Sequence, residues 1–120
     1  MIYKKDGFYL IQLFDRIDRE LMASAYISVL NQEEFKQNTH TLWDFRESMV
    51  DLSFDDIQKN AELLVESFSS QRTDCARSAF IVSDLSDRGI LQTYVTAVSH
   101  YPVEFKLFNN YQDGVIWLLE

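Results

Sequence analysis

The sequence predicts an α/β protein with a mostly parallel sheet and a helical covering. Hydrophobic residues repeat with the period of a strand and then of a helix, again and again along the chain. The resulting order, β-β-α-β-α-β-α-β-α, places helices after strands at short intervals, which favours right-handed crossovers between parallel strands. A chain of 120 residues with 47% hydrophobic residues predicts one domain, over residues 1–120, and is too short for two.

The first half of the chain is expected to form a β-hairpin, a helix and a strand. Residues 2–5 and 8–14 flank Asp6-Gly7, a dipeptide that tolerates the positive backbone angles of a tight turn. Apolar residues at helical spacing predict an amphipathic helix over residues 19–30. Residues 41–45 form the next strand, after which acidic, basic and hydroxyl side chains follow.

The second half is expected to alternate helices with strands. Ser53 is predicted to cap a helix whose apolar face runs from Phe54 to Phe68. Residues 79–82 are wholly apolar, which is typical of a central parallel strand buried on both faces. A third helix follows from residue 90 to residue 98. An edge strand over residues 103–107 and a fourth helix over residues 111–119 complete the order.

Charge and composition disfavour several classes of partner. Eleven Lys and Arg against nineteen Asp and Glu give a net charge of -8, which would repel nucleic acid and anionic membranes. The apolar runs are far shorter than the roughly 20 residues that span a bilayer, so we expect no membrane insertion. The single Cys75 cannot form an internal disulfide, and the opening residues lack the apolar core of a signal peptide. These features predict a cytoplasmic protein.

Two polar clusters follow neighbouring strands and are expected at one rim of the sheet, because the carboxyl ends of parallel strands meet there. In the functional interpretation, this rim orients the polar end of a ligand or partner through Asp44, Arg46, Ser48, Asp84, Arg88 and Gly89. Helix-cap preferences favour a structural alternative. In that alternative the arginines neutralise nearby carboxylates, Ser86 or Asp87 caps the third helix, and Gly89 allows close backbone approach.

Three segments carry a resemblance to a known family: LWDFRES, RSAFIVSDLSDRGILQTYVTAVSHYPVEF and FKLFNNYQDGVIWLLE. They resemble the SpoIIAA-like proteins, a branch of the STAS superfamily whose fold is shared with CRAL-TRIO lipid-binding domains. The resemblance covers nearly the whole chain, and its packing motifs identify the fold better than the function. It implies a single STAS domain whose helices can part from the sheet to enclose a hydrophobic ligand.

The apolar side chains on these elements suit either such a pocket or an ordinary core, since a core of this size needs large side chains. The candidate pocket residues are Trp43, Phe54, Leu64, Phe68, Leu91 and Tyr94.

The resemblance also bears on regulation. In STAS anti-sigma-factor antagonists, the corresponding strand ends in an Asp-Ser-Ser-Gly-like motif, and a serine there is phosphorylated. Asp44 matches the Asp of that motif, but Phe45 and Arg46 occupy the places of the serines. Ser53 is interpreted as a helix cap and Ser48 as a loop hydroxyl, so a phosphoserine switch is not expected.

Catalysis has little support in the sequence. Nothing places His40 or His100 against a serine or against Cys75, and the spacing typical of metal ligands is absent. We therefore expect that the protein has no enzymatic activity and binds neither a metal nor a cofactor. The sequence favours a regulatory or protein-interaction module and is compatible with a homodimer. The alternative is a carrier or sensor of a small apolar, lipid-like ligand held between the helices and the sheet.

Overall fold

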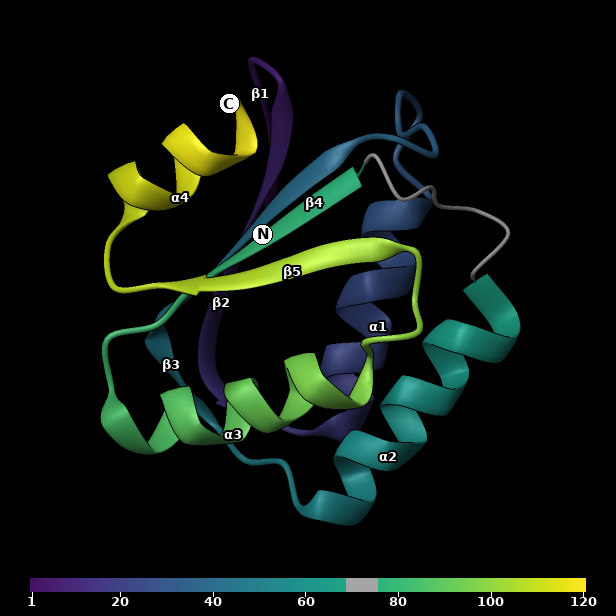
Figure 1. The fold of residues 1–120 in the computed structure, drawn as a ribbon, viewed down its shortest axis with the longest axis vertical. Helices are drawn as coiled ribbons and strands as arrows, with labels where there is room; N and C mark the ends of the chain where they lie inside the picture. The colour runs from purple at the N-terminus through teal and green to yellow at the C-terminus, as the bar shows by residue number, and fades with distance from the viewer. Residues whose placement is uncertain (69–75) are drawn as a thin grey trace.

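The computed structural model describes residues 1–68 and 76–120, and Figure 1 shows their arrangement. The predicted α/β order is confirmed. The elements are β1 (Ile2–Lys5), β2 (Phe8–Ile17), α1 (Arg19–Leu30), β3 (His40–Val50), α2 (Phe54–Leu63), the π-helical turn η1 (Leu64–Phe68), β4 (Ala76–Ile81), α3 (Leu85–Ala97), β5 (Val103–Phe108) and α4 (Tyr111–Leu118).

The strands form one five-stranded sheet in the order β1-β2-β3-β4-β5. β1 pairs antiparallel with β2, and every other neighbouring pair is parallel. Gly7, at a φ of +94°, supplies the positive backbone angle that the turn between β1 and β2 requires. The N-terminal hairpin and the mostly parallel sheet therefore match the prediction.

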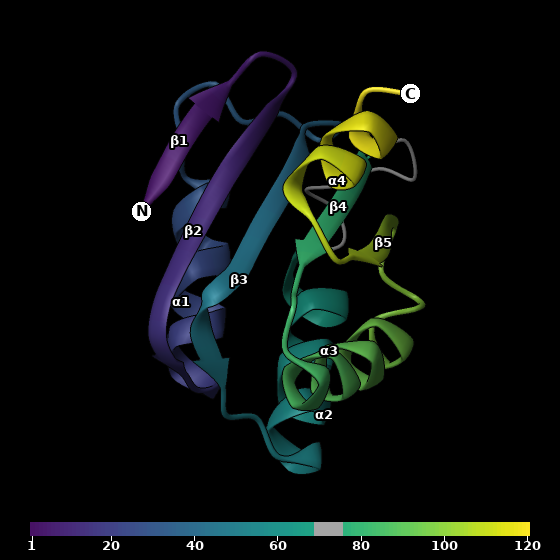
Figure 2. The ribbon, with the colours of Figure 1, turned by 90° about the vertical axis from the view of Figure 1, so that its left-hand side faces the viewer.

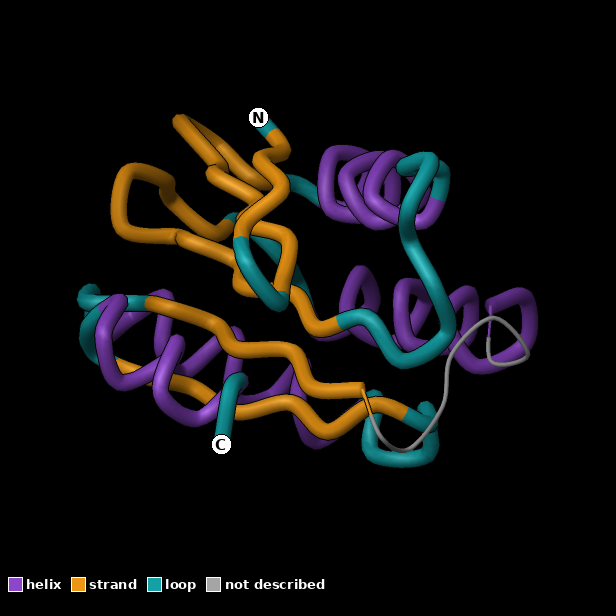
Figure 3. Tube along the Cα trace, turned by 90° about the horizontal axis from the view of Figure 1, so that it is seen from above, coloured by secondary structure: helices purple, strands orange, loops and turns teal. Residues whose placement is uncertain are grey.

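Helices cover both faces of the sheet. The larger core lies between the sheet and α1, α2 and α3, and the smaller core lies beneath α4. Figures 2 and 3 show α4 on the opposite side of the sheet from α1 and α2. In the larger core the ring of Phe80 lies 5.3 Å from Phe45 and 5.5 Å from Phe105, both in edge-to-face contact. These rings join the two central strands to the edge strand β5.

The boundaries of three strands differ from the prediction. β4 runs from Ala76 to Ile81, so it begins three residues before the predicted strand over residues 79–82. β2 and β3 run on to Ile17 and Val50, well past Phe14 and Phe45, because the two strands stay paired up to Ile17 and Val50. The charged residues of β3 concealed this extension, since a strand with one wet face no longer looks apolar.

Two helices also differ from the prediction. The predicted helix that ends at Phe68 divides into α2 and η1. The placement of Phe54 in an apolar pocket is wrong, because its side chain is 68% exposed. Phe54 shares the helical spacing of the buried Ile57 but lies in the first turn of α2, which projects beyond the sheet (Figure 1). α3 begins at Leu85, five residues before the predicted start, because Asp84 caps it.

Candidate functional site

The two central strands separate towards their carboxyl ends. β3 pairs with β4 only from Thr41 to Asp44, whereas it continues beside β2 as far as Val50. The last part of β3 therefore lacks a neighbouring strand on the β4 side, and the first turn of α3 lies against it. Figure 2 shows the two strands diverging there. This separation creates the surface on which the candidate site lies.

A β-bulge changes the direction of β3 at this point. Gln12 pairs with Asp44 and Phe14 with Glu47, so β3 has one more residue than β2 between these pairs. Bulges redirect side chains and are frequent beside functional sites. Here Phe45 stays fully buried in the larger core while Arg46 reaches the surface.

Asp44 and Arg46 form a tight ion pair across the bulge. Asp44 is only 4% exposed. Its carboxylate accepts from Arg46 Nε at 2.9 Å, from a terminal guanidinium nitrogen at 2.8 Å and from the Arg46 backbone N–H at 3.1 Å. Burial alone would raise the pKa of Asp44, but the hydrogen bonds and the charge of Arg46 bring it below its ordinary value. Asp44 is therefore a charged, fully partnered group beneath the surface.

Two more carboxylates mark the beginning of α3. Asp84 accepts from the Asp87 N–H at 2.9 Å and caps the helix, so the expectation that Ser86 or Asp87 is the cap is wrong. Asp87 is buried and accepts from the Val50 N–H at 3.2 Å, at the end of β3. Burial raises the pKa of Asp87, and the negative charge of Asp84 raises it further. The hydrogen bond from Val50 opposes this increase. Asp87 thus connects α3 to the end of β3, on the side where β3 has no neighbouring strand.

These elements enclose an open surface hollow of about 730 Å³. Its lining comes from the end of β3 and the beginning of α3: Arg46, Ser48, Met49, Val50, Ser83, Asp84, Ser86, Asp87 and Ile90. The structure thus brings Arg46, Ser48 and Asp84 of the predicted rim to one place, with Asp44 beneath Arg46.

The other two residues of the predicted rim lie elsewhere. Arg88 donates to the Asn109 side chain at 2.9 Å, at the end of β5. Gly89 lies exposed on α3, with nothing within 4 Å of where a Cβ would stand. The expectation that Gly89 allows close backbone approach is therefore wrong. Because α3 begins earlier than its apolar pattern indicates, Arg88 and Gly89 belong to the helix and not to the loop at the hollow.

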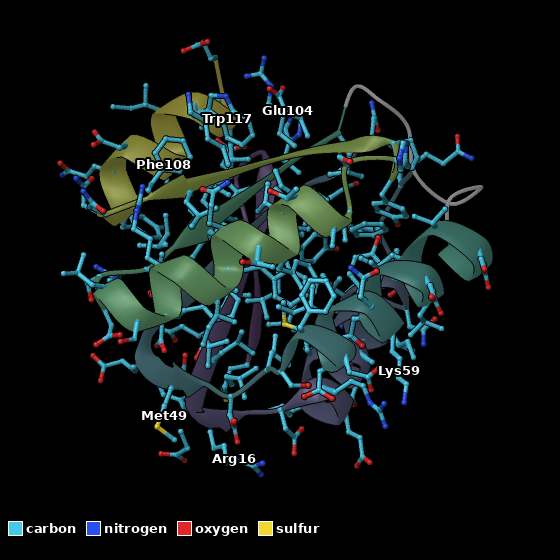
Figure 4. The ribbon with its side chains drawn as sticks, turned by 60° about the horizontal axis from the view of Figure 1, so that its bottom comes forward. Arg16, Met49, Lys59, Glu104, Phe108 and Trp117 are labelled. Carbon is cyan, nitrogen blue, oxygen red and sulfur yellow. The ribbon has the colours of Figure 1, made fainter. Side chains whose placement is uncertain are left out.

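Sequence reasoning missed the apolar part of the hollow. Met49 is 57% exposed, and Figure 4 shows its side chain pointing away from the end of β3. Ile90 of α3 is half-buried and lines the hollow as well. Exposed Glu47 and Met49 alternate with half-buried Ser48 and buried Val50, which is the pattern of a strand. This signal was available in the sequence, but the predicted strand stopped at Phe45.

A second space, inside the larger core, has a volume of about 10 Å³. It is lined by Met22, Tyr26, Trp43, Leu64, Phe80, Tyr94 and Phe105. Such a volume holds about one water molecule, whereas pockets for small ligands measure roughly 300–1,000 Å³. The hydroxyls of Tyr26 and Tyr101 share a hydrogen bond beside it. Burial, with a smaller contribution from Tyr26, raises the pKa of Tyr94.

The predicted pocket residues are only partly brought together here. Trp43, Leu64 and Tyr94 line the internal space, and Leu91 is fully buried in the same core without reaching it. Phe54 faces solvent, and the side chain of Phe68 lies outside the described residues.

Other predictions from the sequence concern metal ligands, the residues His40 and Cys75, and membrane-spanning helices. Within residues 1–68 and 76–120, no three His, Cys, Asp or Glu side chains gather as metal ligands would. His40 accepts the Arg77 backbone N–H through Nδ1 at 3.0 Å, at the beginning of β3. Cys75 lies outside the described residues. None of the helices in the described part of the chain has the length and apolar character needed to cross a membrane.

Comparisons with known proteins bear on the fold. No protein-family model matches the chain, and no curated protein gives a significant match. The structure is similar to the crystal structure of an uncharacterised DUF3478-family protein with a SpoIIAA-like fold from Shewanella loihica PV-4. The TM-score is 0.60 at 20% identity, over 98% of this chain and 90% of that one. The chain therefore has a SpoIIAA-like fold, as the resemblance predicted.

Proposed function

We propose that residues 1–120 form a single, non-enzymatic interaction domain that binds a partner protein at the hollow between β3 and α3. One contrast carries this proposal. The surface hollow measures about 730 Å³, whereas the space between the helices and the sheet measures about 10 Å³. A partner's side chains fit the first without any rearrangement, whereas an apolar ligand fits the second only after the helices part.

The chemistry of the hollow favours a partner segment with both apolar and basic side chains. Met49 and the half-buried Ile90 supply apolar surface in its lining, and such surface is stabilised when a partner covers it. Arg46 is held by Asp44. The exposed Asp84 uses one carboxylate oxygen to cap α3, and its other oxygen can accept from a basic group of the partner. The net charge of -8 would also attract a basic partner.

The partner is expected to bind through its side chains and not by adding a strand to β3. An open strand edge recruits another strand through free backbone N–H and C=O groups. The Arg46 N–H already donates to Asp44, and the Val50 N–H donates to Asp87. These two contacts protect the side of β3 that has no neighbouring strand after Asp44.

We also propose that this interaction works without a phosphoserine switch. The Ser48 hydroxyl donates to the Phe45 carbonyl at 2.9 Å, within the bulge. Ser53 caps α2, accepting from the Asp56 N–H at 3.1 Å while Asp56 accepts the Ser53 N–H at 3.0 Å. Both serines therefore have structural roles that do not require a phosphate.

A displayed library of random linear peptides, selected against the purified protein, tests the proposal. Selected peptides should share a basic residue near apolar ones, and fluorescence anisotropy should show at least tenfold weaker binding to Met49→Asp, a change at an exposed residue in the lining of the hollow. Ile116→Asp is the matched control, because Ile116 is also exposed but lies on α4. Selected peptides that bind both variants as well as the wild type, or a selection that yields no peptides, would exclude the hollow as the binding site.

A ligand carrier is the second candidate function, and the position of the internal space supports it. The space lies between helices and sheet, where an enclosed ligand would be held, and tyrosine hydroxyls stand beside its apolar walls. Pockets for small molecules combine apolar walls with a few polar groups in this way. A retained apolar molecule in the purified protein would favour this function over the first.

A further inference from the structure

The outer edge of β5 is open. β5 pairs with β4 on one side, and no strand in the described part of the chain pairs with its other side. Figures 1 and 2 show β5 at the end of the sheet, with α3 and α4 on either side of it. Open edges of this kind are templates for pairing with another chain.

The direction of the backbone groups determines which residues such a pairing uses. The Phe108 carbonyl accepts from the Val82 N–H at 3.0 Å, so Phe108 faces β4. Since successive residues of a strand direct their N–H and C=O groups to opposite sides, Glu104 and Lys106 also face β4. Val103, Phe105 and Leu107 direct theirs outward.

The side chains of β5 divide differently, because they alternate between the two faces of the sheet. Glu104 and Lys106 are exposed on the α4 face. Phe105 and Leu107 are half-buried on the α3 face, where both pack against the larger core. The edge strand thus has a charged face with one residue of each sign and an apolar face.

We propose that a second copy of this chain pairs with β5 in antiparallel orientation, on a two-fold axis through Phe105. In this register the two Phe105 residues exchange backbone hydrogen bonds, and each Leu107 N–H meets the Val103 carbonyl of the other copy. The Glu104 of each copy lies opposite the Lys106 of the other, which gives two non-hydrogen-bonded pairs, where side chains come closest. On the other face, Val103 lies opposite Leu107, and Phe105 opposite Phe105.

Charge complementarity selects this register over its neighbours. An axis through Glu104 would place the two Glu104 carboxylates opposite each other, and an axis through Lys106 would oppose the two lysines. Directly opposed like charges destabilise a strand pair. The other free edge, β1, has the sequence IYKK and no acidic residue, so it offers two copies no such complement.

Existing contacts leave both charged groups available for the pairing. Glu104 lies 3.9 Å from Arg77 Nε, at the outer limit of an ion pair. Lys106 Nζ stands 5.7 Å from the centre of the Phe108 ring and 6.0 Å from that of Trp117. Figure 4 shows Glu104, Phe108 and Trp117 on this side of the protein. The flexible Lys106 side chain can turn towards a partner carboxylate without disturbing the core.

Sedimentation equilibrium over a range of protein concentrations tests the dimer through charge reversal. Glu104→Lys and Lys106→Glu each convert two attractive pairs into two repulsive ones, which should weaken association on the order of tenfold to a hundredfold. The double variant should restore association to the wild-type level. An equimolar mixture of the two single variants should form heterodimers, because the lysine introduced in one variant then faces the glutamate introduced in the other.

Asp55→Lys and Lys59→Glu are the matched controls. They make the same charge changes at an exposed ion pair on α2, away from β5, and should leave association unchanged. A wild-type protein that stays monomeric into the millimolar range would overturn the proposal. Association that neither β5 reversal weakens, or single variants whose mixture stays monomeric, would overturn it equally.

Discussion

The Asp44–Arg46 pair allows a sharp test of the site's electrostatics, through the substitution Arg46→Met. Methionine keeps much of the length of the side chain but removes both guanidinium hydrogen bonds to the carboxylate. Asp44, only 4% exposed, would keep just the Arg46 backbone N–H as a donor. The variant therefore leaves a buried charge with most of its compensation removed.

The magnitude follows from the burial of the two partners. Breaking a fully buried ion pair costs roughly 3–5 kcal/mol, because the remaining charge stays desolvated. Here the Arg46 side chain is 40% exposed, so water replaces part of what is lost and solvent already screens the pair. We therefore expect Arg46→Met to lower the free energy of unfolding at pH 7 by about 2 kcal/mol.

The pH dependence distinguishes this explanation from a simple loss of packing. In the wild type the pKa of Asp44 is lowered, so the pair stabilises the fold above the ordinary carboxylate pKa and loses this effect as pH falls through the lowered value. In Arg46→Met burial dominates and raises the pKa of Asp44, so protonation relieves the cost of burying the charge. The difference in stability between the two proteins should narrow as pH falls from 7 towards 3.

Urea unfolding followed by tryptophan fluorescence measures both effects. Arg16→Met is the control, because Arg16 pairs with Asp51 through Nε at 2.6 Å while both side chains are largely exposed. That variant should change stability little at any pH. Equal losses for the Arg46 and Arg16 variants, or a difference from the wild type that stays constant from pH 7 to pH 3, would refute the reasoning.

Five further outcomes are expected. Ser53→Ala should lower the free energy of unfolding by about 1 kcal/mol in urea titrations, as a lost cap, while selected peptides bind unchanged. Gly89→Ala should raise it by roughly 0.5–1 kcal/mol, since its Cβ meets nothing within 4 Å. Gly114→Ala should not raise the free energy of unfolding, since a Cβ at this position would lie 2.6 Å from Ile81 Cδ1 in the smaller core. Anisotropy titrations at physiological salt should show no submicromolar binding to DNA or RNA, given the net charge of -8. Native mass spectrometry of gently purified protein should show no adduct, whereas a lipid mass that Leu64→Trp removes would favour the carrier.

The sequence predicted most of the fold because local signals and tertiary structure agree there. The Asp-Gly turn, the amphipathic helix α1 and the apolar strand β4 each follow from a pattern that a single kind of packing imposes. The ends of elements were harder to predict. The carboxyl end of β3 is covered on one face only, so its charges resembled a loop, although its pairing with β2 continues.

The candidate site was only partly predictable, because it depends on two features that leave no local signal. One is the bulge in β3, which is defined by the pairing with β2 and not by the residues of β3 themselves. The other is the early start of α3 at Leu85, where Asp84 takes the cap that Ser86 or Asp87 was expected to provide. Together they place Met49 in the lining of the hollow and take Arg88 and Gly89 away from it.

The two places where the sheet ends differ in how the chain protects its backbone. At the carboxyl end of β3, side chains of the same molecule already accept backbone N–H groups: Asp44 accepts that of Arg46, and Asp87 that of Val50. At β5 the outward carbonyl of Phe105 meets no strand within the described residues, and the charges beside it alternate in sign. A protected edge favours recognition through side chains, whereas an open and self-complementary edge favours a second strand. On this physical ground we propose a different protein as the partner at the hollow and a second copy of the chain as the partner at the β5 edge.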